Sequence, residues 1–340
     1  MSPPSTITRR SVLAGGTALA VAAPFVKAKA ADAAVTFRTG FLSAVDAQWG
    51  AHWTATDKKF FEAENIAEEI NPGGPNAPPT LTALSAGRFD IAIGNWFGVV
   101  DAVAKNNDFV IIASNYPKNP AGLMSLPKAP IRNAADIVDK RILLQFTYYT
   151  ETIDGILKYN KQPTRYTPRP TGFSADTLLN GDGEGYFSYV DRSPIILEMR
   201  GMKPGEDFFV TTFTSMGYDL PDGLYTVKRE TLEKNRPAVV RYLRALLRGV
   251  AVNDKDPDYL TDIITKKYLA ERALDPKVQK RQAEIYKSLS RVDGGKGPLW
   301  FSPQQIDRMY EFAAISGRTN IPDRSKIIDL GPLEEALRTL

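Results

Sequence analysis

Four short segments of the sequence combine aromatic rings with amide, hydroxyl and charged side chains. Each follows a stretch that is predicted to form a strand, and ligands of open α/β sheets bind beyond the carboxyl ends of the strands. The rings can stack on a planar molecule, and the polar groups can fix its orientation. The candidate ligand contacts are Asp46, Gln48, Trp49, His52, Trp53, Asn95, Trp96, Thr147, Tyr148, Tyr149, Tyr189, Asp191 and Arg192.

The tryptophans are unevenly distributed, because three of the four in the chain, Trp49, Trp53 and Trp96, fall in these segments. A tryptophan in a loop offers a large flat apolar surface and one hydrogen-bond donor. Each could contact a ligand or pack its own loop against the nearby core, and both interpretations stay open for any single one. As a set, the three favour a binding site.

The polar candidates have structural alternatives as well. Thr147 lies near a predicted helix start, where it could cap the helix or leave backbone N–H groups for an anionic group. Asp191 and Arg192 could contact a polar ligand group or pair with each other. His52, the only histidine, could contact a ligand, although a lone histidine is more often packed or capping.

The composition gives little support for catalysis. The chain has no cysteine and one histidine, and it shows no spacing that is typical of a metal site. We therefore predict no catalytic residue, no metal and no cofactor.

Residues 1–30 have the features of an export signal of the twin-arginine type. Arg9 and Arg10 precede a mildly apolar stretch that ends at Val26, and small residues surround a cleavage site after Ala30. Glycines and a proline interrupt the apolar stretch, which falls short of the ~20 residues of a membrane span. We expect cleavage near Ala30 and a freely diffusing periplasmic protein.

Removal of this signal would change the charge balance of the chain. The whole chain has 43 lysines and arginines and 39 aspartates and glutamates. The signal contains four basic residues and no acidic one, so 39 of each sign would remain. A formally neutral chain gives no reason to expect nucleic acid as a partner.

The apolar pattern behind these segments alternates between strand-like and helix-like periods, which is typical of α/β architecture. Predicted strands cover residues 35–40, 68–71, 91–93, 141–145 and 185–190. Predicted helices cover residues 53–64, 80–87, 131–139, 153–157, 229–252 and 302–316. Chains of this length more often form two lobes than one. We therefore expect two α/β lobes followed by helices.

Five short motifs occur along the chain in a fixed order. They are FEAENI at residues 61–66, ALSAGRFDIAIG at 83–94, ADIVDKRI at 135–142, LLNG at 178–181 and NRPAVVRYLRAL at 235–246. In this order the chain resembles the type II periplasmic solute-binding proteins, in the group that serves importers of sulfonates, nitrate and thiamine-pyrimidine precursors. The inserted Arg236 and the displaced aspartate after Gly181 depart from the family pattern and leave the strand register of the second lobe open.

The resemblance implies two lobes, each a mixed sheet flanked by helices, that hold the ligand between them by closure. It places the first lobe at residues 31–125 and 225–340 and the second at 126–224, with crossings near 123–126 and 222–227. It also implies a monomeric solute-binding component that meets the permease subunits of an ABC importer. Many rings and few cations favour a planar, heterocyclic or otherwise nitrogenous solute over a bare oxyanion, and the resemblance adds sulfonates.

Three arginines of the predicted helix 229–252 have a further possible role. Arg241, Arg244 and Arg248 fall on one face of this helix by their spacing. A solvated face is the simpler interpretation, and contact with the permease is the alternative.

An enzyme is the alternative function. A eukaryotic branch that resembles this family makes a thiamine pyrimidine with pyridoxal phosphate and a histidine that is consumed, so His52 keeps this alternative open. That branch carries a cysteine-rich motif, which this sequence lacks.

Overall fold

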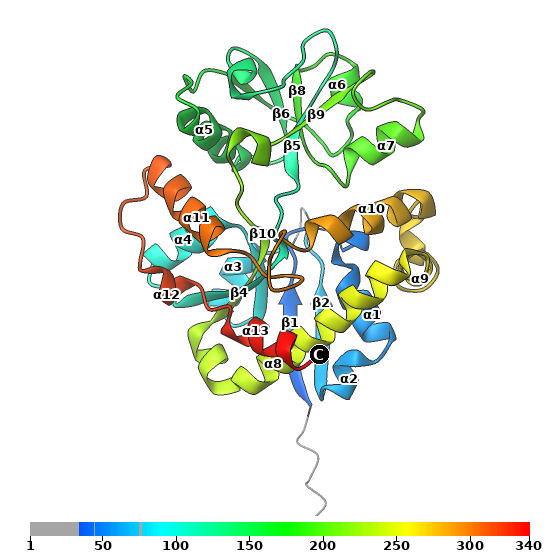
Figure 1. Ribbon diagram of the computed structural model, residues 1–340, viewed down its shortest axis with the longest axis vertical. Helices are drawn as coiled ribbons and strands as arrows, with labels where there is room; N and C mark the ends of the chain where they lie inside the picture. Colours follow the sequence, from blue (N-terminus) through cyan, green and yellow to red (C-terminus); the bar gives the residue numbers. More distant parts are fainter. Residues whose placement is uncertain (1–33, 44, 75–76) are drawn as a thin grey trace, which may run out of the picture. The chain divides into compact units, whose positions relative to one another are not determined.

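The structure is a computed structural model that describes residues 34–43, 45–74 and 77–340. The predicted export signal at residues 1–30 lies outside the described residues. Residues 34–340 form two five-stranded sheets, each flanked by helices (Figure 1). None of the helices in the described part of the chain has the length and apolar character needed to cross a bilayer.

The first sheet has the strand order β2-β1-β3-β10-β4. Its strands are β1 (Val35–Gly40), β2 (Ile66–Asn71), β3 (Ile91–Gly94), β4 (Phe109–Tyr116) and β10 (Asp222–Lys228). Strand β10 runs antiparallel to both of its neighbours, whereas β1 is parallel to β2 and β3. Ile91, Ala92 and Ile93 of β3 are fully buried, as expected for a central strand that is covered on both faces.

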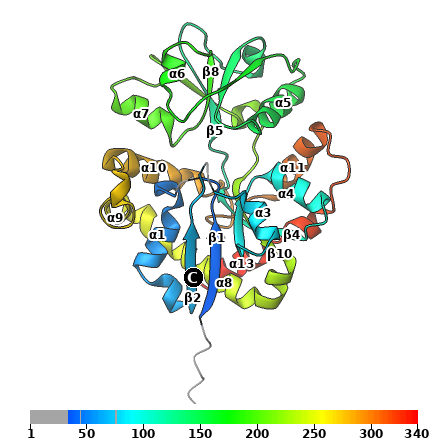
Figure 2. The ribbon, with the colours of Figure 1, turned by 180° about the vertical axis from the view of Figure 1, so that it is seen from behind.

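Helices from both ends of the chain cover this sheet. They are α1 (Gly50–Asp57), α2 (Phe60–Ala63), α3 (Thr80–Ser85), α4 (Trp96–Ala104), α8 (Arg229–Lys255) and α13 (Gly331–Arg338). Figures 1 and 2 show α8 lying along one face of the sheet, where its apolar side joins β1 and α1 in one core. The prediction of one helix over residues 53–64 is wrong, because Lys59 takes a left-handed conformation (φ 59°) and separates α1 from α2.

The second sheet has the strand order β7-β6-β8-β5-β9, which matches the first sheet position by position. Its strands are β5 (Ala121–Ser125), β6 (Arg141–Leu144), β7 (Thr167–Pro170), β8 (Gly185–Tyr189) and β9 (Phe209–Thr212). Its helices are α5 (Tyr149–Tyr159), α6 (Asp176–Leu179) and α7 (Ser193–Met199). The predicted helix at 131–139 is reduced to a 3₁₀ turn at Ala134–Ile137, because Val138 is extended and Asp139 has a positive φ.

The remaining helices belong to the last third of the chain. They are α9 (Pro257–Ile263), α10 (Pro276–Leu289), α11 (Pro303–Ile315) and α12 (Arg324–Ile327). Helix α11 starts at a capping box made by Ser302 and Gln305. It packs against α5 of the second sheet, where Phe312 stacks on Tyr159 at 5.2 Å between ring centroids.

The chain crosses between the two sheets at residues 117–120 and 213–221. These crossings lie several residues before the expected ones at 123–126 and 222–227, which fall inside strands β5 and β10. Strand β5 pairs with β8 and β9, so we assign residues 34–116 and 222–340 to the first lobe and 121–212 to the second. The Asn119 amide joins the two crossings, because it donates to the Leu220 carbonyl oxygen at 2.6 Å.

The three arginines of α8 bind Glu64, two through its buried carboxylate and one through its backbone, instead of forming a solvated face. Glu64, just after α2, has a side chain that is 7% exposed. Arg248 and Arg244 approach its carboxylate oxygens at 3.0 and 3.3 Å, and Arg241 donates to its carbonyl oxygen at 2.8 Å. This cluster fixes the end of α2 on α8.

We expect Glu64→Gln to lower the free energy of unfolding by about 2 kcal/mol, because it removes the buried negative charge that two guanidinium groups share. Chemical denaturation followed by circular dichroism measures the change. Glu62→Gln is the matched control, since Glu62 is exposed and pairs with Lys59 at the surface. Its loss should have almost no effect. Equal effects of the two substitutions would contradict this role of Glu64.

Candidate ligand-binding site

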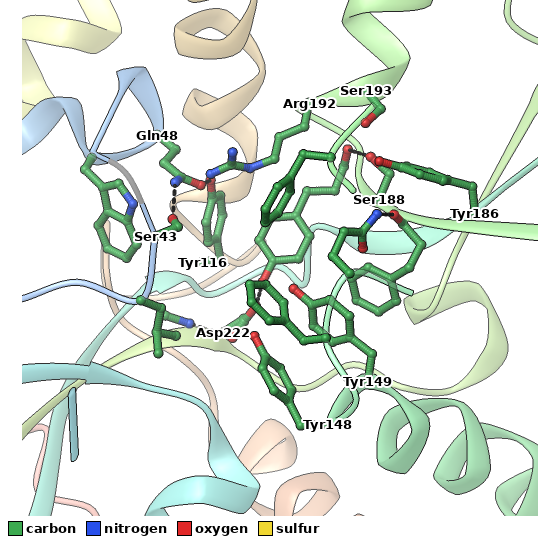
Figure 3. Close-up of a pocket in the computed structure, with 18 residues that line it drawn as sticks. Ser43, Gln48, Tyr116, Tyr148, Tyr149, Tyr186, Ser188, Arg192, Ser193 and Asp222 are labelled. Atoms are coloured by element: carbon green, nitrogen blue, oxygen red, sulfur yellow. Dashed lines mark hydrogen bonds between the residues drawn. The ribbon is translucent and has the colours of Figure 1, made fainter. Parts of the chain in front are cut away.

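A pocket lies where the two lobes meet, and both contribute to its walls (Figure 3). The space between its walls that no atom fills measures about 700 Å³, part of which is open solvent. The first lobe contributes Leu42, Ser43, Gln48, Trp49, Tyr116, Asp222 and Gly223. The second lobe contributes Gln145, Phe146, Tyr148, Tyr149, Phe173, Tyr186, Phe187, Ser188, Tyr189, Arg192 and Ser193.

The topology of the sheets explains why these residues meet. Gln48 and Trp49 follow β1, Tyr148 follows β6, and Arg192 follows β8, so all lie beyond the carboxyl ends of parallel strands. Strand β10 runs antiparallel, so its first residue, Asp222, reaches the same edge.

A second pocket adjoins the first one. The two share Leu42, Tyr148, Tyr149, Phe187, Tyr189 and Asp222. Beyond the shared residues, its lining includes Asn95, Trp96, Phe97, Asp101, Glu151 and Tyr218. The shared side chains therefore form a wall that faces both pockets.

Stacked aromatic rings build this wall. Tyr149 stacks on Phe187 with ring centroids 3.7 Å apart, and Tyr148 meets Tyr149 edge-on at 4.6 Å. The Tyr189 hydroxyl donates to the Asp222 carboxylate, and Figure 3 shows the hydroxyls of Tyr148 and Tyr149 directed into the cavity toward Asp222. Partial burial raises the pKa of Tyr148 to about 12, and burial raises the pKa of Tyr149 well above its usual value, so both phenols are neutral hydrogen-bond donors at physiological pH.

Arg192 supplies the positive charge of the first pocket. Its guanidinium lies 3.7 Å from the Asp46 carboxylate of the first lobe. Burial lowers the pKa of Arg192, but the charges of Asp46 and Asp191 outweigh this effect and raise it. Asp46 is itself held in place, because it caps the 3₁₀ turn at Ala47–Trp49 by accepting from the Gln48 N–H. The ion pair therefore joins the two lobes at the rim of the pocket.

Asp191 lies behind the pocket and is fully buried. The Tyr116 hydroxyl lies 2.7 Å from its Oδ2 and 3.0 Å from the Gln48 amide oxygen, and it can donate to one of them at a time. The other oxygen of Asp191, Oδ1, has no hydrogen-bond partner among the described residues. Burial raises the pKa of Asp191 to about 6, although Arg192 and Tyr116 act in the opposite direction.

The sequence-based candidates divide into three groups. Those that line the first pocket are Gln48, Trp49, Tyr148, Tyr149, Tyr189 and Arg192. Asn95 and Trp96 line only the second pocket, where Asn95 also caps α4 and the Trp96 indole donates to the Met309 carbonyl oxygen at 2.5 Å. Asp46, His52, Trp53, Thr147 and Asp191 line neither pocket.

Packing explains why two of these predicted contacts lie away from the pockets. His52 is fully buried on α1, and its ring nitrogens lie 2.6 Å from Glu68 Oε1 and 2.9 Å from the Tyr225 hydroxyl. Trp53 stacks on Tyr268 with ring centroids 5.1 Å apart.

Thr147 is exposed, and it does not cap α5 with its side chain. Its carbonyl oxygen instead accepts from the Thr150 hydroxyl at 2.7 Å.

Several lining residues were not predicted. Gln145 ends a predicted strand and Phe146 directly follows it, so the strand-end rule could have included both. Tyr116 ends β4 and could have been found by the same rule if β4 had been predicted. Phe173 and Asp222 carry no comparable sequence signal, because their positions depend on the second lobe and on the crossing at 213–221. Among the described residues, no group of three or more His, Asp or Glu side chains is placed to hold a metal ion.

The buried Asp191 predicts a pH dependence of stability. Native Asp191 keeps its proton up to about pH 6, whereas the unfolded chain loses it near pH 4. Unfolding therefore releases a proton in this interval, and stability should fall by about 3 kcal/mol as the pH rises through it. Asp191→Asn should remove this slope, which denaturation at pH 4, 5, 6 and 7 measures.

Asp176→Asn is the control for this measurement. The hydrogen bond from Arg200 lowers the pKa of the exposed Asp176, so this carboxyl titrates below about pH 4 and its loss should leave the slope between pH 4 and 7 unchanged. An unchanged slope in Asp191→Asn would contradict the assignment of a raised pKa to Asp191.

Comparison with known proteins places this arrangement in a family. The sequence matches the NMT1/THI5-like family over residues 46–259. No curated protein matches it.

Several solved structures share the fold. The ligand binding component of an ABC-type import system from Staphylococcus aureus superposes with a TM-score of 0.65 at 13% identity, covering 89% of this chain and 99% of that chain. The periplasmic aliphatic sulphonate binding protein SsuA from Escherichia coli gives 0.65 at 14% identity, with 86% and 92% covered. The periplasmic nitrate-binding protein NrtA from Synechocystis PCC 6803 gives 0.59 at 13%, with 90% and 89% covered. The two sheets and their crossings are those of the two-lobed periplasmic binding protein fold, and the chain belongs to the NMT1/THI5-like family.

Proposed function

We propose that this protein is the solute-binding component of an ABC importer and captures a small organic solute between its two lobes. The pocket that both lobes build from aromatic rings and a short set of polar groups carries the proposal. A site of this kind buries most of a small ligand, and its polar groups select the orientation. Closure of the lobes around the ligand would complete the walls.

The chemistry of the walls favours a planar, heterocyclic or sulfonate-type solute. Tyr148, Tyr149 and Trp49 offer ring surfaces for stacking, and Gln48 and Arg192 offer hydrogen-bond donors. Arg192 shares its charge with Asp46, so a bare oxyanion such as nitrate would meet few uncommitted donors.

Export and partners form part of the same proposal. The twin-arginine pattern at residues 1–30 supports export to the periplasm with cleavage near Ala30. The structural neighbours include a periplasmic binding protein and a component of an ABC-type import system, which supports delivery of the solute to the permease subunits of an importer. We propose that the protein does so as a monomer.

The enzymatic alternative with pyridoxal phosphate does not fit the residues present. The cofactor needs a lysine for its Schiff base, and none of the described residues that line the two pockets is a lysine. His52 lies in the core with both ring nitrogens engaged. We therefore derive no reaction for this site.

We expect at least one member of a panel of sulfonates, pyrimidines and related heterocycles to raise the melting temperature by roughly 5 °C at a hundredfold excess over its Kd. The same ligand should change the tryptophan fluorescence, because Trp49 lines the pocket. Trp49→Phe should remove most of this change.

Trp53→Phe is the matched control, since Trp53 lies outside both pockets against Tyr268. It should keep the ligand-dependent change in fluorescence. If no member of the panel, extended to organic cations, alters the melting temperature or the fluorescence of the wild-type protein, solute binding at this site is overturned.

A further inference from the structure

Carboxylates outnumber cationic side chains around the two pockets. Asp222 lines both pockets, and Asp101 and Glu151 line the second. Arg192 is the one cationic residue among the described residues that line either pocket. The cleft is therefore acidic, although the chain as a whole carries a formal net charge of +4.

The positive charge of Arg192 is already balanced by the protein. Its guanidinium lies 3.7 Å from Asp46, and the buried Asp191 is the preceding residue. An anionic ligand that approached Arg192 would have to compete with these carboxylates. The arginine therefore acts mainly as the partner of Asp46 across the two lobes.

Two of the acidic side chains are balanced in the same way. Arg318 binds Asp101 through two hydrogen bonds of 2.6 and 2.7 Å and reaches Glu151 at 3.0 Å. Glu151 also lies in the first turn of α5, where its charge offsets the positive end of that helix. The first turn of α5 thus gives an anionic ligand little attraction.

Asp222 differs from the other carboxylates of the cleft. Its oxygens accept from the Tyr189 hydroxyl and, at 2.8 Å, from the Gly223 N–H, both of which are neutral donors. No lysine or arginine within the described part of the chain forms an ion pair with it. Burial raises the pKa of Asp222, although the hydrogen bonds from Tyr189 and Gly223 act in the opposite direction.

The aromatic wall surrounds this carboxylate. Tyr148, Tyr149 and Tyr189 line both pockets together with Asp222. The face of an aromatic ring attracts a cation electrostatically, most strongly when the cation is desolvated. Tyr148 is 42% exposed, and one face of its ring stacks on Phe146 with ring centroids 5.2 Å apart.

We infer that the solute is an organic cation, a protonated or quaternary amine on a compact or planar skeleton, whose positive group lies between Asp222 and the rings of Tyr148, Tyr149 and Tyr189. The inference rests on the proposed function and narrows it. A cationic solute would distinguish this protein from two of its structural neighbours, which are described as sulphonate-binding and nitrate-binding proteins.

Phenyltrimethylammonium and benzenesulfonate are suitable probes, because both carry a charged group of similar size on the same ring. Isothermal titration of the purified full chain should detect the cation, with benzenesulfonate binding at least tenfold more weakly. Asp222→Asn should weaken binding of the cation by about tenfold and should not weaken binding of the anion.

Two substitutions of Tyr148 test the inference independently, in case Asp222→Asn does not fold. Tyr148 is well exposed, so Tyr148→Leu should fold normally and weaken binding of the cation several-fold. Tyr148→Phe keeps the ring face, so it should weaken binding of the cation less. Asp219→Asn is the control, because Asp219 lies in the nearby crossing but lines neither pocket. It should bind the cation as the wild type does.

The outcomes separate this inference from the proposed function. If benzenesulfonate or a neutral heterocycle binds and the cation does not, the inference is overturned and solute binding stands. Unchanged binding of the cation in both Asp222→Asn and Tyr148→Leu also overturns it. If no solute of either charge binds, the proposed function fails together with the inference.

Discussion

The binding site depends on strand β10, which completes the first sheet only after the chain has passed through the second lobe. The strand fills the gap between β3 and β4 and bonds to both. Leu224, Tyr225 and Val227 bury their side chains on alternate faces, and displacement of the strand would separate β4 from the rest of the sheet. The same placement brings Asp222 to the pocket and fixes both crossings.

The backbone conformation at the start of β10 also favours one residue type. Gly223 has φ 62°, a region that favours glycine. A Cβ atom there would lie 3.0 Å from Asn115 Cβ and 3.2 Å from the Trp49 indole. The close approach of backbone and ring sets the position of Trp49 at the pocket wall. A residue with no side chain thus links the crossing at 213–221 to the loop after β1.

A polar network below the pocket explains why the single histidine is structural. Glu68 Oε1 accepts hydrogen bonds from the hydroxyls of Tyr242 at 2.9 Å and Thr39 at 3.1 Å, in addition to its contact with His52. The hydroxyl of Tyr225 on β10 completes the network by hydrogen bonding to the other ring nitrogen of His52. Buried polar groups persist when they are hydrogen-bonded, and such a network favours one arrangement of β1, β2, α1 and β10.

Five of the ten strands in the described part of the chain and six of the eighteen residues that line the first pocket are predicted from the sequence, and the reason for the limit is geometric. Hydrophobic alternation identifies β1, β3, β6 and β8, and the strand-end rule then leads to Gln48, Trp49, Tyr148 and Arg192. The rule gives a position along the chain but not the direction of a side chain. His52 and Trp53 lie on α1, where residues 50–55 are all buried, and so they face the core.

Contacts between residues that lie far apart in the sequence could not be predicted, for a different reason. Asp222 contacts Tyr189 across a separation of 33 residues, and Tyr116 contacts Asp191 across 75. Nothing local in the sequence marks either pair, because each depends on the topology of two sheets. The assignment of β5 to the second lobe has the same origin, since only its pairing with β8 and β9 reveals it.

Different residues determine the fold and the ligand specificity, so the fold can be retained while the residues that contact the ligand change. The neighbours superpose over most of their length at 13–14% identity, so burial pattern and strand order suffice to keep two lobes and a cleft. The cleft wall consists mainly of side chains at strand ends and crossings, and its exposed members Phe146, Tyr148 and Phe173 lie outside the buried cores. A carboxylate such as Asp222, with only neutral donors around it, costs stability in a protein without ligand. A cation that binds there offsets this cost, and it does so only in the conformation in which both lobes reach it.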